Sequence, residues 1–200
     1  MKLYFSQTSP YVRKVSVVLI ETGLDNSVEK IPTNVWDPET EIIKFNPLGK
    51  VPTLIIDDAT IIYNSPLICE YLDSLHNGEK LFPTNDTNRW KALGLQALGD
   101  GMMDAGIIAL LESRRSKEVI NTEWIGRQNQ VIKRVLDDLE NKLEDLQSTV
   151  NIGHVSIACS LGWFDFRFPD LGWRKDHPGL ADWFEYISER RSMVHTMPKS

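Results

Sequence analysis

Two short motifs in the first third of the chain could stabilise an anion. Ser9-Pro10 and Ser65-Pro66 each place a hydroxyl before proline, a residue favoured at the first position of an α-helix. Each motif comes soon after a predicted strand, and a helix N-terminus there offers unsatisfied N–H groups and the positive end of the helix dipole. A thiolate or a carboxylate suits such a position. Asp37-Pro38 has the same pattern, but we interpret Asp37 as a helix cap only.

The remaining reactive side chains predict neither a metal site nor a redox site. Cys69 and Cys159 each lie inside an apolar stretch, and we interpret both as small core residues. The four histidines are scattered, with no pair at ligand spacing, so no metal is expected. The low cysteine content and the absence of an apolar signal segment at the start of the sequence favour the cytoplasm.

Composition and charge narrow the class of protein. The 200 residues are 42% hydrophobic and 25% charged, which excludes a disordered chain, a collagen-like chain and a coiled coil. The net charge is −6 and neither half has a basic excess, so no nucleic-acid partner is expected. The most apolar early run, residues 15–20, is far shorter than the roughly 20 residues of a membrane span, so we expect no membrane insertion.

The periodicity of apolar residues predicts two domains of different class. Residues 1–77 read as β-α-β-α-β-β-α, which predicts a mixed sheet with helices on its faces. Residues 78–88 form a linker rich in turn residues, and residues 89–200 read as an all-helical domain. The predicted strands are 2–7, 29–32, 53–57 and 61–63, and the predicted helices are 10–22, 37–45, 65–76, 89–112, 124–146, 154–166 and 180–190.

Three blocks of sequence in the first domain have a recognisable order and spacing: Ser9-Pro10-Tyr11-Val12-Arg13-Lys14-Val15, Asn46-Pro47-Leu48-Gly49-Lys50-Val51-Pro52-Thr53-Leu54 and Asn64-Ser65-Pro66-Leu67-Ile68-Cys69-Glu70-Tyr71-Leu72. In these blocks the chain resembles the cytosolic glutathione S-transferases. It is particularly similar to bacterial members with serine in the Ser-Pro-Tyr/Phe position. The helical second half matches as well, so the resemblance covers essentially the whole chain. It implies a thioredoxin-like first domain, glutathione as co-substrate and a homodimer.

The resemblance also implies a role for individual residues. Ser9 is expected to be the catalytic residue that stabilises the glutathione thiolate. The backbone of Val51, ahead of a cis bond to Pro52, is expected to pair with the cysteinyl part of glutathione like an added strand. Ser65 matches the residue that holds the γ-glutamyl carboxylate, and Asn64 matches the one that receives the γ-glutamyl ammonium.

The sequence departs from the family pattern at two positions. Asn64 stands where the family usually has Glu, Gln or Asp, which we expect to cost about 1 kcal/mol of glutathione binding. Asp100 or Asp104 could supply the missing charge across a dimer interface, or could simply be solvated helix residues. The family also usually has a Ser/Thr-x-x-Asp capping box where this chain has Asn151 to His154. We expect Asn151 to cap its helix and His154 to reciprocate poorly.

The electrophile pocket is the least specified part of the predicted site. Tyr11, Trp36, Met102 and Met103 are expected to line it, with the aromatic residues of 163–168 as further candidates. Methionines and aromatics at helical spacing also suit a core, so that alternative stays open. Glycines between 99 and 106 are unusual inside a predicted helix, and a close ligand, a partner helix or a kink would each explain them.

The predicted function is conjugation of the glutathione thiolate to small hydrophobic electrophiles, a detoxification activity. Serine in place of cysteine excludes a mixed disulfide at this position, and no Gly-x-Ser-x-Gly elbow marks Ser9 as an acyl-transfer nucleophile. Ser6 and Thr8 are rival hydroxyl donors, whereas Tyr4 is interpreted as sheet packing. Two alternatives stay open: a non-catalytic member acting as a protein-interaction or regulatory module, and other glutathione chemistry such as peroxide reduction or reductive dehalogenation.

Overall fold

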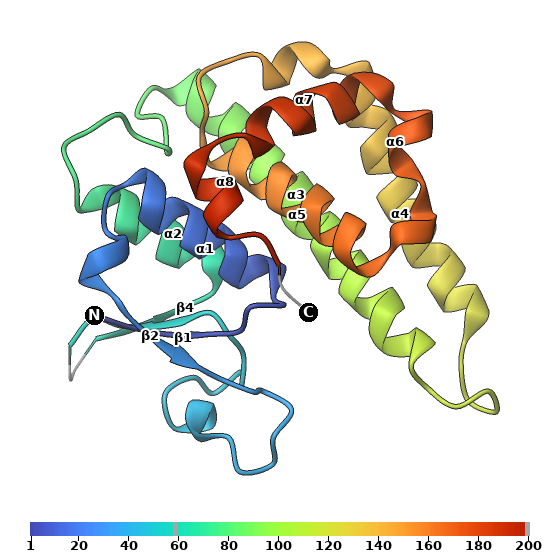
Figure 1. Ribbon diagram of the computed structural model, residues 1–200, viewed down its shortest axis with the longest axis horizontal. Helices are drawn as coiled ribbons and strands as arrows, with labels where there is room; N and C mark the ends of the chain where they lie inside the picture. The colour runs from blue at the N-terminus through green and yellow to red at the C-terminus, as the bar shows by residue number, and fades with distance from the viewer. Residues whose placement is uncertain (58–59, 199–200) are drawn as a thin grey trace. The chain divides into compact units, whose positions relative to one another are not determined.

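The structure, a computed structural model, describes residues 1–57 and 60–198. A small mixed sheet with helices is followed by a helical second part (Figure 1), which confirms the predicted fold class. The elements are β1 (Lys2–Phe5), α1 (Pro10–Glu21), η1 (Asp25–Ser27), β2 (Glu29–Pro32), η2 (Glu41–Lys44), β3 (Thr53–Ile55), β4 (Ile61–Tyr63), α2 (Ser65–Ser74), α3 (Asp86–Ser113), α4 (Thr122–Asn141), η3 (Leu143–Leu146), α5 (Ile152–Arg167), η4 (Pro169–Leu171), α6 (Trp173–Asp176), α7 (Pro178–Ser188) and α8 (Arg191–His195), where η marks a 3-10 helix.

The four strands form one sheet in the order β2-β1-β3-β4. β1 pairs in parallel with β2 and antiparallel with β3, which pairs antiparallel with β4. The register aligns Tyr4 with Thr53, and Thr53 with Tyr63. Side chains alternate along a strand, so Leu3 and Leu54, both fully buried, point to the opposite face of the sheet from these three. Helices α1 and α2 lie on the same side of the sheet (Figure 1).

The segment predicted as a helix over residues 37–45 forms no α-helix. Only the short 3-10 helix η2 occurs there, and Asp37 is not a helix cap. Its Oδ1 accepts from the N–H of Glu39 at 2.9 Å, and its carbonyl accepts from the N–H of Thr40 at 3.0 Å. The aspartate therefore closes a local turn on itself, a competing use of the same side chain. The segment predicted as one helix over residues 124–146 is interrupted, because α4 ends at Asn141 and the 3-10 helix η3 follows it. The other predicted strands and helices are present with shifted ends.

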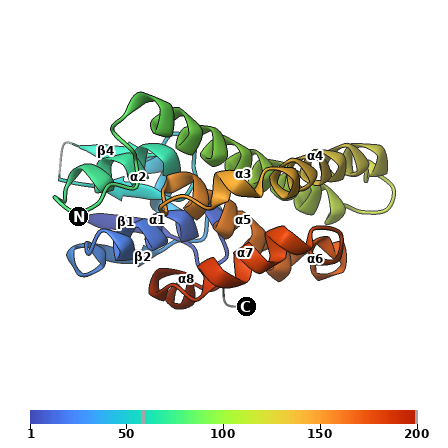
Figure 2. The ribbon, with the colours of Figure 1, turned by 90° about the horizontal axis from the view of Figure 1, so that it is seen from above.

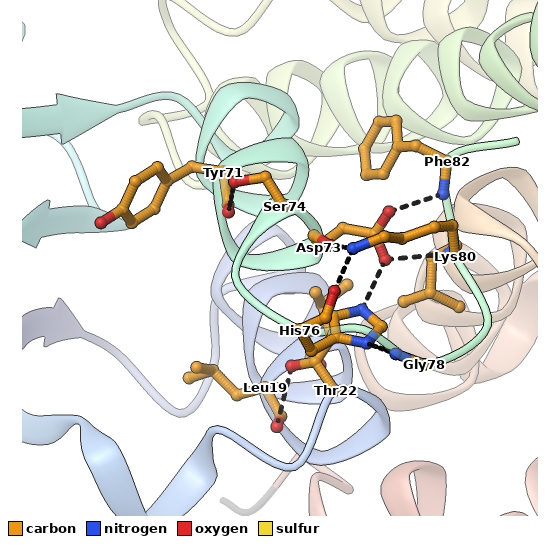
Figure 3. Close-up of polar contacts among 11 residues, drawn as sticks. Leu19, Thr22, Tyr71, Asp73, Ser74, His76, Gly78, Lys80 and Phe82 are labelled. Carbon is orange, nitrogen blue, oxygen red and sulfur yellow. Dashed lines mark hydrogen bonds and ion pairs between the residues drawn. The ribbon is translucent and has the colours of Figure 1, made fainter. Parts of the chain in front are cut away.

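A polar cluster fixes the chain where α2 ends (Figure 3). Asp73 is buried, and its two carboxylate oxygens accept from the N–H groups of Leu81 and Phe82 at 2.9 and 3.1 Å. His76 bonds to the same carboxylate at 3.1 Å, and the Lys80 ammonium donates to the backbone carbonyls of Asp73 and His76. The side chain of Lys80 thus satisfies carbonyls at the end of the helix, and the side chain of Asp73 satisfies amides of the segment that follows.

Helices α3 and α5 lie side by side in Figures 1 and 2. A Cβ built on Gly99 would lie 2.6 Å from Ser156 Oγ, and one on Gly106 would lie 2.6 Å from the Trp163 ring. Both distances are too short for a real contact, so only glycine allows α5 to approach this closely. A partner helix therefore explains these two glycines, and no ligand or kink is needed there.

The N-terminus of α5 differs from the prediction in one respect. Asn151 caps the helix as expected, with Oδ1 accepting from the N–H groups of Gly153 at 2.9 Å and His154 at 3.4 Å. His154 also reciprocates, because its Nδ1 accepts from the N–H of Asn151 at 3.2 Å. The expectation of poor reciprocation was wrong: a neutral imidazole has a ring nitrogen free to accept, so it can replace a carboxylate in the box.

The chain divides into two compact units, Met1–Thr84 together with the described residues from Arg190 onward, and Asn85–Glu189. The last residues, which the sequence analysis grouped with the helical half, thus return to the first unit. There Glu21 at the end of α1 accepts from Arg190 Nη2 at 2.6 Å and from the hydroxyl of Ser192. The buried Arg13 donates to the carbonyl of Met193 at 3.3 Å.

Candidate functional site

The strand register of the first unit gathers the predicted glutathione-site residues at one end of the sheet. Tyr4, Thr53 and Tyr63 are neighbours across β1, β3 and β4. At this end of the sheet β1 ends, and the chain continues to Ser9. β3 begins here with Thr53, directly after Val51-Pro52. β4 ends here with Tyr63, and Asn64-Ser65 follows directly. The topology therefore brings three chain segments together that are up to 56 residues apart in the sequence.

Ser9 is the N-cap residue of α1, as predicted. Its backbone is extended, and its Oγ accepts from the N–H of Val12 at 3.3 Å. A hydroxyl that accepts through oxygen still has its own proton to donate, so capping and donation to a thiolate are compatible. The side chain is half-buried, which leaves it accessible to a ligand.

The rival hydroxyl donors are engaged with each other, since Ser6 Oγ and Thr8 Oγ1 lie 3.3 Å apart and share a hydrogen bond. Tyr4 packs its ring on Phe45, with the centroids 5.1 Å apart. Burial, together with Glu41 and Glu29, raises the pKa of Tyr4, which favours the protonated phenol. These contacts agree with the interpretation of Tyr4 as sheet packing.

A cavity of about 370 Å³ is open on the Tyr4 side of the sheet, lined by Lys2, Phe45, Ile55 and Ile61 among others. Lys2, Ile55 and Ile61 align across the strands at the start of β1, whereas Ser9 follows the end of β1. The cavity is therefore displaced toward the other end of the sheet, and it is not the candidate site.

The bond between Val51 and Pro52 is cis, as the resemblance implied. Pro52 is buried and Val51 is half-buried, just outside the strand that begins at Thr53. A backbone next to the end of a strand is well placed to pair with an extended ligand. The loop before it is organised by Asn46, the first residue of the second sequence block, whose side chain bonds to Leu48, Lys50 and Thr53. The seven-residue spacing between Asn46 and Thr53 gives no recognisable signal in the sequence.

Ser65 is the first residue of α2 rather than its cap, because the cap position belongs to Asn64. Ser65 is only 1% exposed, and within residues 1–57 and 60–198 its Oγ has no hydrogen-bond partner. A buried hydroxyl without a partner is costly, and at a helix N-terminus a carboxylate could satisfy both the hydroxyl and the free N–H groups. This geometry fits the γ-carboxylate predicted for it.

Asn64 is exposed and has φ of 80°, a backbone region that asparagine enters more readily than most residues. Its side chain makes no capping bond to α2. Residues held at positive φ cluster at ligand sites, where the surrounding structure maintains them. The amide of Asn64 is therefore exposed beside Ser65 and not used in capping the helix.

The four residues predicted to line the electrophile pocket differ in exposure. Tyr11 is half-buried and Trp36 is 70% exposed, both in the first unit. Met102 and Met103, in the second unit, are fully buried, as the core alternative expects. Asp100, one of the two predicted charge donors, accepts from Ser156 Oγ at 2.7 Å within its own unit. The pocket and the cross-dimer charge both stay predictions.

The described part of the chain contains no cluster of three or more histidine, cysteine or carboxylate residues that could hold a metal ion. In residues 1–57 and 60–198, no helix combines the length and the apolar character needed to cross a membrane.

Comparison with known proteins identifies the family of this chain. The family model for the glutathione S-transferase N-terminal domain matches residues 8–75, and the model for the C-terminal domain matches residues 122–185. The chain is 35% identical to an uncharacterized GST-like protein, YibF, of Escherichia coli K12. The matched region covers 99% of this chain and 98% of that protein.

A glutathione transferase family member from Pseudomonas fluorescens Pf-5 has been solved with bound glutathione. It is 41% identical, with a TM-score of 0.95 over 100% of this chain and 99% of that one. The structure of the Pf-5 family member with bound S-(propanoic acid)-glutathione has a TM-score of 0.92 over the full length of both chains, again at 41% identity. The present chain belongs to the glutathione S-transferase family.

Proposed function

We propose that this protein is a glutathione transferase that conjugates the glutathione thiolate to small hydrophobic electrophiles. The observation that carries the proposal is the buried hydroxyl of Ser65, which has no partner among the described residues at the start of α2. Ser65 and the α2 N-terminus hold the γ-glutamyl carboxylate, Asn64 accepts from its ammonium, and Val51 pairs with the cysteinyl backbone beside Pro52. Binding of glutathione and of a glutathione thioether by the Pseudomonas relative supports this assignment.

Ser9 activates the sulfur in this proposal. A free thiol has a pKa near 8.5, so only about 3% is thiolate at pH 7. A hydroxyl donating to the sulfur anion at a helix N-terminus, worth roughly 2 kcal/mol, would lower that pKa by about 1.5 units and make about half of it thiolate. The thiolate then attacks the electrophilic carbon, a C–S bond forms, and the leaving group departs with its electron pair. The thiol proton goes to solvent.

The experiment is conjugation of an aryl halide by the wild type, Ser9→Ala and Ser6→Ala. Ser6 offers a matched serine on the same loop that we do not place at the sulfur. We expect Ser9→Ala to lower the rate at saturating glutathione and pH 7 by about 15-fold, because the thiolate falls from about half to about 3% of the bound thiol, and Ser6→Ala to leave the rate within about twofold. Equal rates for wild type and Ser9→Ala would remove Ser9 from its role. No conjugate with any electrophile would overturn the enzymatic proposal.

One observation favours the alternative of a non-catalytic interaction module. Asn64 presents a neutral amide, where the resemblance leads us to expect an acid or glutamine, and it faces solvent. Calorimetry with glutathione separates the two functions. Binding at millimolar glutathione or below supports the transferase, and no detectable heat at that concentration supports the interaction module.

The dimer, the cytoplasmic location and the detoxification role belong to the same proposal. Leu67 on α2 is 56% exposed and Trp90 on α3 is 67% exposed, and a partner subunit could cover such apolar side chains. Sedimentation equilibrium tests the dimer, because a mass of 22.9 kDa would show a monomer and twice that mass a dimer.

A further inference from the structure

Asn46 is a buried side chain, 1% exposed, whose amide is fully engaged next to the Val51-Pro52 segment. Its Nδ2 donates to the carbonyl of Lys50 at 3.0 Å and to Thr53 Oγ1 at 3.0 Å. Its Oδ1 accepts from the N–H of Leu48 at 2.9 Å. One side chain therefore makes three hydrogen bonds to three other residues of the same loop.

The groups that hydrogen-bond to Asn46 determine which way its side-chain amide is turned. The Lys50 carbonyl only accepts and the Leu48 N–H only donates, so Nδ2 and Oδ1 are assigned without ambiguity. Thr53 Oγ1 also donates to the Lys50 carbonyl at 2.9 Å, which closes a triangle of three bonds. A buried network in which every member is satisfied holds its parts in one arrangement.

The two residues bonded to Nδ2 flank the predicted glutathione-binding backbone on both sides. Lys50 precedes Val51, and Thr53 follows Pro52 and begins β3. Thr53 is in turn paired with Tyr4 and Tyr63, so Asn46 ties the two intervening residues to the sheet. The only covalent path between these anchor points is Val51-Pro52.

We propose that Asn46 is a positioning residue that holds the backbone of Val51 where it pairs with the cysteinyl part of glutathione. The inference rests on the proposed function and goes beyond it, because Asn46 acts through Val51 rather than on the ligand. Without the Nδ2 bonds, the Val51 backbone must be ordered when glutathione binds, and part of the binding free energy is lost.

The turn and the positioning role use different atoms of the same amide. The turn needs Oδ1, which accepts from the Leu48 N–H, whereas positioning needs the two donors of Nδ2. Asn46→Asp keeps the acceptor, removes both donors and directs a carboxylate oxygen at the Lys50 carbonyl. This substitution therefore separates the two roles, which Asn46→Ala would remove together.

The experiment compares the glutathione Kd by calorimetry, kcat at saturating glutathione and the melting temperature. We expect Asn46→Asp to raise Kd about tenfold, as the loss of buried hydrogen bonds implies, with kcat within about twofold because Ser9 belongs to α1. Asn121→Ala is the control, since Asn121 caps α4 through a 2.9 Å bond to the Trp124 N–H, outside the first unit. It should lower the melting temperature and leave Kd unchanged.

A second pair of variants keeps the test valid if Asn46→Asp fails to fold. Thr53→Val removes the hydroxyl that bridges Asn46 and Lys50, and we expect a rise in Kd of about threefold; Thr53→Ser keeps the hydroxyl and the affinity. An unchanged Kd in Asn46→Asp, or in Thr53→Val if that is the variant available, would overturn the inference alone. So would a rise in Kd in Asn121→Ala equal to that in Asn46→Asp. A wild type that binds no glutathione would overturn the proposed function and the inference with it.

Discussion

Helices α2 and α5 both begin at an asparagine, yet the two asparagines are used in opposite ways. At α5, Asn151 caps the helix and His154 bonds back to it. At α2, Asn64 has a positive φ and makes no capping bond, and the hydroxyl of the next residue, Ser65, has no partner among the described residues.

The difference separates a helix start that the protein caps itself from the one that we propose binds glutathione. At α5 the protein itself satisfies the orphan N–H groups, so that end has little left to offer a ligand. At α2 the N–H groups, a buried hydroxyl and an exposed amide are left for something else, and an anionic ligand with an ammonium group would satisfy all three. A helix start whose groups the protein leaves unsatisfied therefore indicates a binding site better than the residue type does.

Of the substitutions at the two helix starts, Ser65→Ala is expected to have the largest effect, which is a weaker binding of glutathione. Removing a hydrogen bond to a carboxylate costs about 1.5–3 kcal/mol, so the glutathione Kd should rise about 10- to 150-fold. The stability of the protein should be unchanged or slightly higher, because this hydroxyl bonds to no described residue. Calorimetry and urea unfolding measure the two quantities.

Ser74→Ala is the matched control on the same helix. Ser74 lies at the end of α2, where its Oγ donates to the Tyr71 carbonyl at 2.6 Å (Figure 3). Its removal should leave the glutathione Kd unchanged. If Ser65→Ala binds glutathione as tightly as Ser74→Ala, α2 does not begin at a carboxylate site.

For Asn151→Ala, at the start of α5, we expect a loss of stability without a loss of glutathione binding. Loss of a cap costs about 1 kcal/mol and up to about 2 kcal/mol, so the free energy of unfolding should fall by that amount with no change in the glutathione Kd. Urea unfolding measures the loss, and Asn151→Ser, which retains a capping oxygen, should recover most of it. Unaltered stability in Asn151→Ala would contradict the structural reading of this helix start.

A smaller change is expected from Asn64→Asp. A carboxylate in place of the amide adds charge assistance to the bond with the glutathione ammonium, which should tighten binding about fivefold, or roughly 1 kcal/mol. Aspartate also tolerates the positive φ at this position. Asn64→Gly keeps the backbone and removes the side chain, so it should bind more weakly than wild type. Equal affinity in all three proteins would show that Asn64 does not face the ammonium.

The smallest expected effect is a pH dependence from His154. Burial lowers its pKa below the ordinary value of 6.5, an effect that the Leu146 carbonyl opposes. The folded state thus binds this proton less readily than the unfolded state, so its stability is highest above pH 6.5 and falls as the pH drops below that value. Protonation of Nδ1 also removes the acceptor for the Asn151 N–H.

Melting temperatures between about pH 8 and pH 5 test this dependence. His154→Gln supplies a side-chain oxygen that does not titrate, and glutamine is a usual partner in a capping box. The wild type should lose more stability than His154→Gln over the acidic part of this range. Parallel curves for the two proteins would assign the acid sensitivity to other groups.

The sequence predicted most of the fold because long apolar patterns and turn residues decide it locally. It failed over residues 37–45, where Asp37 is equally able to cap a helix or to close a turn, and no long apolar face selects the helix. In α4 the buried apolar side chains are Ile132, Leu136 and Leu139, whereas Val131 and Val135 are only half-buried. Because these apolar residues are adjacent in the sequence, the pattern alone does not decide which of them face the core.

The sequence motifs located Ser9, Val51 and Ser65, but the contacts of the site depend on residues that only the fold brings together. The Ser65-Pro66 pattern does not reveal that Asn64, not Ser65, holds the cap position, nor that burial leaves the Ser65 hydroxyl without a partner among the described residues. The hydrogen bonds of Asn46 are hidden from the sequence for a similar reason. Its donors reach Lys50 and Thr53 only after the loop has closed on β3.

The central claim is that the hydroxyl of Ser9 keeps the sulfur of bound glutathione ionised. Titration of that thiol by its thiolate absorbance, in the complex with wild type and with Ser9→Ala, measures this directly. We expect the pKa of bound glutathione to be about 1.5 units below that of the free thiol in the wild type, and close to the free value in Ser9→Ala. A thiol that ionises no more readily in the wild-type complex than in buffer would contradict the claim.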